Sequence, residues 1–180
     1  MPSPHKSSRR KSKITAICGL LSALSLVILL MGSIIPAALF ACPVLAMVMS
    51  IPAVEQFGTK TAFCLYAVTA ILALLLAADK ELAMFYLFVG YYPAIRQKLD
   101  RFPRWARIVI KLLIFNTAIA VMYALIIFVF RLSAVIAEFH TTGRTLIALT
   151  VLLGNITFLL FDICLKRLTY VYNTKFAGKI

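Results

Sequence analysis

Three consecutive charged residues, Asp79, Lys80 and Glu81, stand between two apolar stretches and are the first candidates for chemistry. Two carboxylates beside an ammonium could coordinate or gate a polar solute at the mouth of a cavity. The alternative is a solvated turn that joins two helices. Tyr86 follows one to two helical turns later. Its ring could line the same cavity or serve as apolar packing.

Two amide side chains, Asn116 and Asn155, lie deep in apolar stretches. Amides in an apolar environment seek partners, and between membrane helices such hydrogen bonds contribute roughly 0.6–2 kcal/mol. The two could therefore pair with each other, or Asn155 could hold a ligand. Tyr123 and Thr157 are plausible companions in the same region.

Asp162 is an acid near the end of the last long apolar run. A carboxylate at that depth is expensive to bury and is a candidate for function. Lys166 follows one helical turn later, at the i,i+4 spacing of an ion pair. An interfacial ion pair with Lys166 is the preferred interpretation.

Motifs of known catalytic chemistry are missing from the sequence, which has no Gly-rich phosphate loop, no His-Glu-x-x-His and no Gly-x-Ser-x-Gly. Its two histidines, His5 and His140, are isolated. Metal sites need ligands at short intervals, whereas the cysteines are scattered through apolar stretches. We therefore expect no enzyme, no metal site and no cofactor, and we expect the cysteines to act as small packing residues.

The elements that position these side chains are very apolar. Of 180 residues, 63% are hydrophobic and only 14% are charged, against about 25% charged in a typical soluble domain. Apolar runs of about 18 residues or more are long enough to cross a bilayer. The sequence predicts an all-α, polytopic transmembrane bundle over residues 14–169. The six expected spans are 14–31, 37–54, 61–78, 82–99, 108–130 and 145–165.

Two of these spans are expected to be irregular. Pro43 and Pro52 should kink the second span, because proline removes a helical hydrogen bond. In the fourth, only residues 82–95 are free of charge, which is about 21 Å of helix for a hydrocarbon core of about 30 Å.

The net charge of +13 favours one orientation in the membrane. Nucleic-acid binding is disfavoured, because the cations cluster at the ends of apolar runs, where they set topology. With the N-terminus inside, only Lys80, Arg131 and Arg144 of the 19 Lys and Arg residues fall outside. We therefore predict a multi-pass protein of the cell membrane with both termini cytoplasmic.

The ends of the chain are polar and basic. Residues 1–13 are Ser-rich and are expected to be a disordered cytoplasmic tail, and residues 170–180 form a second basic cytoplasmic tail. The apolar run from residue 14 to about residue 35 is too long for the core of a secretory signal, so a retained first span is expected.

The basic segment 96–107 carries Leu99, Phe102 and Trp105 at helical spacing. Such a segment can lie in the membrane interface, with its cations on anionic lipid. A cytoplasmic contact surface for a partner protein is the alternative, and the lipid interpretation is preferred.

Small residues recur every fourth position on the first span, at Thr15, Gly19 and Ala23. This spacing puts them on one helix face, which we call the small-residue face and which another helix can approach closely. It could dock a partner membrane protein, or it could serve ordinary packing within the bundle.

The basic N-terminus, the small-residue face and six compact spans together resemble a substrate-binding S component of bacterial energy-coupling-factor (ECF) transporters, of the uncharacterised Gram-positive type. The similarity covers nearly the whole chain in architecture. At the level of motif it rests on the first span, Ile14-Thr15-Ala16-Ile17-Cys18-Gly19-Leu20-Leu21-Ser22-Ala23-Leu24-Ser25.

This resemblance implies a subunit that binds a small solute, such as a vitamin or precursor, and docks through its first helix on a membrane coupling protein with cytosolic ATPases. The family's Ala-xxx-Ala docking pattern would fall on Gly19 and Ala23, with Gly in place of the first Ala. By the same resemblance the solute would be held by residues of the outer cavity. These would be Asp79, Lys80, Glu81, Tyr86, Tyr123 and Asn155. The alternative function is a membrane scaffold or assembly protein that binds other membrane proteins through small-residue helix faces.

Overall fold

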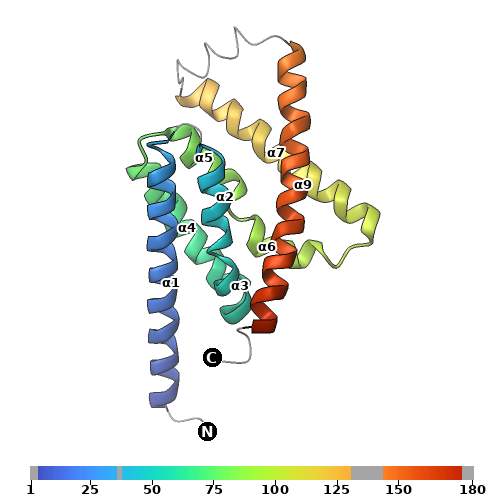
Figure 1. The fold of residues 1–180 in the computed structure, drawn as a ribbon. Coiled ribbons are helices and arrows are strands. Elements are labelled where there is room, and N and C mark those ends of the chain that lie inside the picture. Colours follow the sequence, from blue (N-terminus) through green and yellow to red (C-terminus); the bar gives the residue numbers. More distant parts are fainter. Residues whose placement is uncertain (1–3, 36–37, 131–143, 176–180) are drawn as a thin grey trace. The chain divides into compact units, whose positions relative to one another are not determined.

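The computed structural model describes residues 4–35, 38–130 and 144–175, and every element in these ranges is helical (Figure 1). The predicted all-α class is confirmed. Four of the helices are long and apolar enough to cross a membrane, at Ser12–Gly32, Thr59–Leu76, Trp105–Phe128 and Thr145–Lys175. Their length and composition support a membrane-embedded protein.

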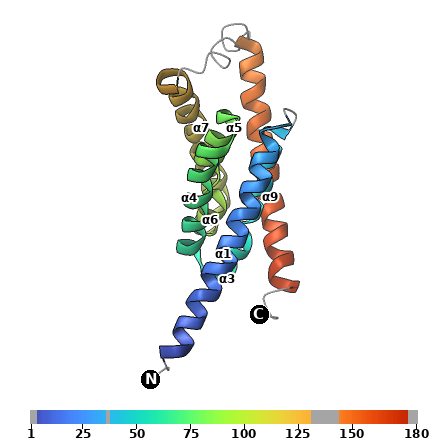
Figure 2. The same cartoon turned by 90° about the vertical axis from the view of Figure 1, so that its left-hand side faces the viewer.

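The chain forms two compact units, which are described separately. Unit 1 comprises residues 1–96 and 171–180, and unit 2 comprises residues 97–170. Unit 1 is built on α1 (Pro4–Gly32), which packs against α2 (Ala41–Val48) and α4 (Thr59–Leu76). Figure 2 shows α1 as one unbroken helix.

Two contacts show how closely α1 and α2 approach. The Ser25 hydroxyl donates to the Ala46 carbonyl at 3.3 Å. At the end of α1, a Cβ added to Gly32 would lie 2.5 Å from Cys42 Cβ and 2.8 Å from Leu82 Cδ1. Glycine is therefore required at this position for the packing of α1 on α2 and on the helix that carries Leu82.

The second predicted span is interrupted, as its prolines indicate. It consists of α2 and α3 (Ile51–Phe57), which are separated at Met49 and Ser50. Pro52 lies in the first turn of α3, where its missing N–H leaves no helical bond unmade. Pro43 lies in the first turn of α2 for the same reason.

The fourth predicted span is likewise broken, into α5 (Lys80–Val89) and α6 (Tyr92–Leu99). Gly90 lies at the break, where a Cβ would sit 3.2 Å from the Tyr66 ring, and Pro93 lies in the first turn of α6. Each of the six predicted spans overlaps one or two helices among the described residues. Only the four unbroken ones are long enough and apolar enough to cross a membrane as single helices.

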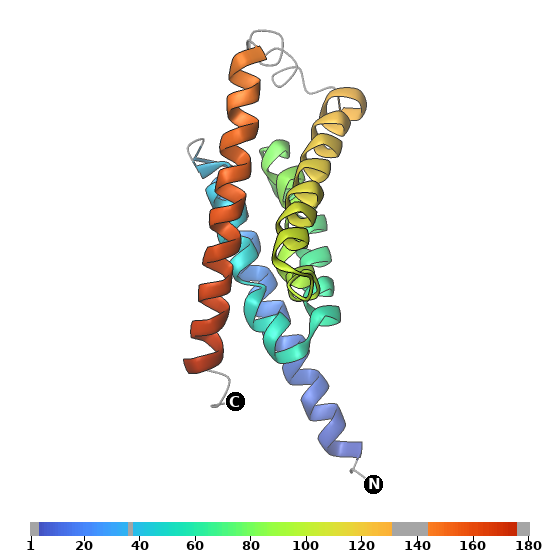
Figure 3. The same ribbon diagram turned by 90° about the vertical axis from the view of Figure 1, so that its right-hand side faces the viewer.

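Unit 2 contains α7 (Arg104–Leu125), the π-helical turn η2 (Ile126–Phe130) and α9 (Arg144–Lys175), whose last residues belong to unit 1. In Figure 1, α7 crosses α9 obliquely, and Figure 3 shows the pair from another side. The rings of Phe115 and Phe158 stack with their centroids 4.4 Å apart. The two helices run antiparallel, because residues that come later on α7 contact residues that come earlier on α9.

Residues 1–13 were predicted to be a disordered tail; residues 1–3 lie outside the described residues, and the structure has residues 4–13 in α1 (Pro4–Gly32). Lys, Arg and Ser are compatible with a helix, and extending an existing helix avoids the unfavourable nucleation step. The apolar first span can therefore carry its helix into the basic segment. At the other end, α9 continues to Lys175, within the predicted second tail.

Candidate functional site

The predicted solute residues of unit 1 lie at the junction of α4 and α5. Asp79 is the N-cap of α5, and its Oδ1 accepts hydrogen bonds from the backbone N–H groups of Glu81 at 2.9 Å and Leu82 at 3.4 Å. An acid at this position satisfies orphan donors of the first turn and complements the helix dipole. Glu81 lies in that first turn and is partly exposed.

Lys80 caps the C-terminal end of the preceding helix, α4. Its ammonium donates to the carbonyls of Leu74 at 3.0 Å and Ala77 at 2.9 Å, at the C-terminal end of α4. A cation favours that end of a helix, where carbonyls lack partners. Asp79 and Lys80 thus hold the turn between the two helices together.

Tyr86, on α5, is completely buried. Its ring lies 6.0 Å from that of Tyr66 on α4, centroid to centroid, and the Tyr66 hydroxyl donates to the Leu87 carbonyl. The phenol of Tyr86 is therefore part of the packing between α4 and α5.

The other two predicted solute residues, Tyr123 and Asn155, belong to unit 2. Asn155 pairs with Asn116: Asn116 Nδ2 donates to Asn155 Oδ1 at 2.6 Å, and Asn155 Nδ2 returns a bond to Asn116 Oδ1 at 3.2 Å. Each amide also donates to the carbonyl four residues earlier, Leu112 and Val151, at 2.8 Å. Both donors of each NH₂ group are thus used. Of the two alternatives for these amides, their mutual pairing is present in the structure. Tyr123 is partly buried on α7.

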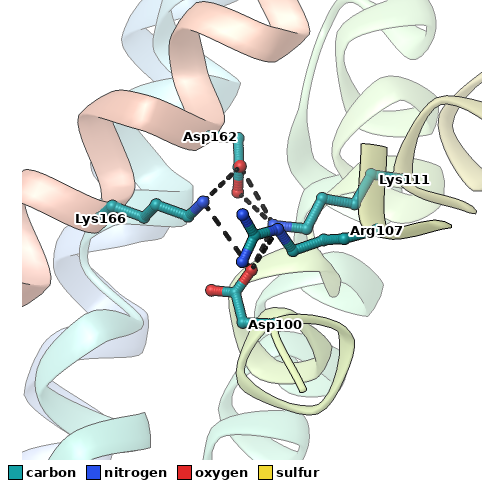
Figure 4. Close-up of polar contacts among 5 residues, drawn as sticks. All are labelled: Asp100, Arg107, Lys111, Asp162 and Lys166. Atoms are coloured by element: carbon teal, nitrogen blue, oxygen red, sulfur yellow. Dashed lines mark hydrogen bonds and ion pairs between the residues drawn. The ribbon is translucent and has the colours of Figure 1, made fainter. Parts of the chain in front are cut away.

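A group of five charged residues in unit 2 is the most elaborate polar arrangement in the described part of the chain. We call it the Lys111 network. Its members come from α7, from α9 and from the turn that follows α6 (Figure 4). They are Asp100, Arg107, Lys111, Asp162 and Lys166.

Lys111 lies at the centre of this network and its side chain is only 2% exposed. Its ammonium contacts Asp100 Oδ1 at 2.7 Å and the two carboxylate oxygens of Asp162 at 2.9 and 3.0 Å. Three contacts match the three donors of an ammonium. A buried charge needs this degree of pairing, because desolvation costs several kcal/mol per ion.

The two remaining cations lie at the edge of the network and are more exposed. Lys166 Nζ lies 3.5 Å from Asp162 Oδ2 and 3.9 Å from Asp100 Oδ1, and Arg107 Nε lies 3.9 Å from the same Asp100 oxygen. Their side chains are 36% and 24% exposed. The predicted Asp162–Lys166 ion pair is present, but Lys111 is the closer partner of Asp162.

Sequence reasoning missed the central role of Lys111, which it counted only as a cation of the inner side. The signal was nevertheless present, because Lys111 and Asp162 carry opposite charges inside two predicted spans. Each is expensive alone and neutralises the other when paired. Asp100 gave no such signal, because it lies among the cations of the basic segment.

The small-residue face of α1 is exposed along its length at Thr15, Gly19 and Ala23. A Cβ added to Gly19 would meet no atom within 4 Å. The helix packs within unit 1 through the adjoining side, where Ser22, Ser25 and Leu29 are buried.

Among the described residues, no group of three or more His, Cys, Asp or Glu side chains is arranged to hold a metal ion. Cys18, Cys42, Cys64 and Cys164 are free thiols. No protein-family model, curated protein or solved structure matches the chain.

Proposed function

We propose that this chain is a membrane-embedded binding subunit, similar to the S components of ECF transporters, that takes up a small solute such as a vitamin or precursor for an ATP-driven importer. It docks on a membrane coupling protein, which in turn carries cytosolic ATPases. The observation that carries the proposal is the exposed small-residue face of α1.

The small-residue face is exposed, whereas the adjoining side of α1 packs within unit 1. Internal packing uses the adjoining side with Ser25 and Leu29, and Gly19 and Ala23 remain exposed beside it. The open space at Gly19 admits another helix to backbone distance, which is how small residues promote association in membranes. If this face contacted only lipid, Leu side chains would serve equally well, so small residues are not needed for that contact.

The proposal includes six crossings of the cell membrane with both termini cytoplasmic. The broken helices Ala41–Phe57 and Lys80–Leu99 supply the two crossings beyond the four long helices. At 1.5 Å per residue they extend about 25 and 30 Å, respectively, near the thickness of the hydrocarbon core. Breaks within such helices are tolerated where neighbouring helices cover the freed backbone groups.

The experiment that tests the proposal is purification of the tagged protein in mild detergent, with the co-purifying proteins identified by mass spectrometry. We expect a membrane coupling protein and ATPases, and a loss of at least about tenfold in their recovery when Gly19 and Ala23 are both changed to Leu, because bulk on this face holds helices apart. Leu20→Phe with Leu24→Phe is the matched control, since both positions are exposed on the neighbouring side of α1. Recovery of the protein without these partners would overturn the assignment.

A membrane scaffold is the second candidate, and one observation favours it. Asp79, Lys80 and Asn155 are engaged in the protein's own caps and amide pair, so the solute would have to compete with these contacts. A scaffold needs the small-residue face but no solute site. Co-purification of other membrane proteins, lost with the same Leu substitutions, would favour this function over the importer subunit.

A further inference from the structure

The Lys111 network contains more positive than negative charge. Its two carboxylates face three cations, and the ammonium of Lys111 has its three donors occupied by Asp100 and Asp162. The surplus lies on Arg107 and Lys166, which we call the cationic rim.

The nitrogen donors of the cationic rim make only long, weak contacts with the carboxylates of the network. Arg107 Nε and Lys166 Nζ both stand 3.9 Å from Asp100 Oδ1, beyond the range of a hydrogen bond. Lys166 approaches Asp162 no closer than 3.5 Å, whereas charge-assisted hydrogen bonds between nitrogen and oxygen are about 2.7–2.9 Å. Both side chains are partly exposed, so an anion from outside can reach them.

The surroundings of the rim indicate where that anion comes from. Trp105 is 87% exposed and Phe102 is 49% exposed, and both lie in the segment that leads into Arg107. Exposed aromatic rings beside cations are typical of the boundary between headgroups and acyl chains. Ile108 and Ile163, adjacent in sequence to Arg107 and Asp162, are also exposed and offer apolar surface at this level.

We propose that the cationic rim, Arg107 and Lys166, binds the phosphate of an anionic phospholipid headgroup at the membrane interface. The guanidinium of Arg107 supplies a planar pair of donors to phosphate oxygens, and Lys166 supplies a point charge. Exposed apolar side chains at the same depth contact the acyl chains, which a free phosphate lacks. This site does not depend on the function proposed above.

The test uses the full chain purified in zwitterionic detergent and titrated with dioctanoyl phosphatidylglycerol, with thermal unfolding as the readout. Dioctanoyl phosphatidylcholine and inorganic phosphate are the comparison probes. We expect a saturable rise in Tm with the phosphatidylglycerol and none with the other two at equal concentration. An equal rise with inorganic phosphate would overturn the proposal by identifying a free-anion site, and an equal rise with the phosphatidylcholine would overturn it by removing the role of charge.

The variant that tests the residues is Arg107→Gln with Lys166→Gln, and the matched control is Lys98→Gln with Arg101→Gln. The control removes the same charge from exposed positions that no ion pair of the network includes. We expect phosphatidylglycerol to bind the rim variant about 30-fold more weakly, since each cation near an anionic lipid contributes a factor of several. The control should lose less than a third as much. Equal losses would mean general attraction to the membrane surface and would overturn the site.

If the double change prevents folding, a second variant still tests the role of Arg107. Arg107→Lys retains the charge but removes the planar pair of donors. We expect it to weaken phosphatidylglycerol binding several-fold while the midpoint of unfolding without lipid stays unchanged. Unaltered binding in Arg107→Lys would exclude the guanidinium from the site.

Discussion

Changing Asp162 to Asn tests whether the Lys111 network stabilises unit 2 through its buried charges. Asn is nearly the same size as Asp but removes the charge that faces Lys111 at 2.9 and 3.0 Å. Because the side chains of Lys111 and Asp162 are only 2% and 9% exposed, solvent screens their attraction little.

The magnitude follows from burial and from the remaining partner. At 2.9 Å and an effective dielectric constant of 20, the Coulomb attraction is about 6 kcal/mol, and desolvation of each ion opposes it by several kcal/mol. Removing one partner of a buried pair costs about 3–5 kcal/mol, because the other charge stays behind. Lys111 keeps Asp100 at 2.7 Å, so we expect the lower end, about 3 kcal/mol.

The assay is reversible unfolding in mixed micelles with increasing sodium dodecyl sulfate, followed by far-ultraviolet circular dichroism. Lys111→Met should also destabilise, and the double variant with Asp162→Asn should lose at least about 2 kcal/mol less than the sum of the two single changes. Arg167→Gln, an exposed charge on the same helix, should change stability by no more than about 0.5 kcal/mol. A cost below about 1 kcal/mol for Asp162→Asn, or strict additivity in the double variant, would refute this reasoning.

Three further substitutions address other contacts, each measured by the same unfolding assay. Asn155→Leu should cost about 1–2 kcal/mol, because Asn116 then loses its amide partner; a smaller loss in the double variant Asn116→Leu/Asn155→Leu would identify that unpaired amide as the cause. Gly32→Ala should lower the free energy of unfolding by about 1–3 kcal/mol, because the added Cβ collides with Cys42. Gly154→Ala is the control, since a Cβ there meets nothing within 4 Å, and it should be neutral or stabilising by up to about 1 kcal/mol. Equal effects of the two changes would contradict the close packing at Gly32. Asp79→Ala should cost about 1 kcal/mol through loss of the α5 cap, and Asp79→Asn should retain most of that stability; a harmless Ala substitution would show that the cap contributes nothing.

The helices themselves were largely predictable, because length and apolar content determine where a chain can cross a bilayer. The break between α2 and α3 was also predictable, since Pro52 cannot sit in the interior of an unbroken helix. The break between α5 and α6 appeared only as an unusually short charge-free run. Gly90 lies at this break and Pro93 lies in the first turn of α6, while the packing of the Tyr66 ring against Gly90 joins residues that are distant in sequence.

The candidate site was less predictable, because its contacts join different helices. The Asp162–Lys166 pair follows from the geometry of one helix, in which residues four apart are neighbours. The contact between Lys111 and Asp162 depends instead on how α7 and α9 pack, which a single sequence does not specify. The N-capping role of Asp79 was predictable from the local sequence but was not predicted, although Asp is a common N-cap residue directly before a helix.

The contacts between α7 and α9 also bear on the membrane crossings proposed for these helices. Lys111 contacts Asp162, Phe115 stacks on Phe158 and Asn116 pairs with Asn155, so the contact positions rise on α7 as they fall on α9. In the proposed topology both helices cross the bilayer, and antiparallel crossings place the start of α7 and the part of α9 around Lys166 on one side. The basic segment 97–107 and the cations Lys166 and Arg167 therefore share a side, which is the cytoplasmic one in the proposed topology. Lys111 lies further into the pair of α7 and α9 than the basic segment and Lys166. Its two carboxylate partners, Asp100 and Asp162, neutralise its charge there, so Lys111 is compatible with the clustering of cations on the cytoplasmic side.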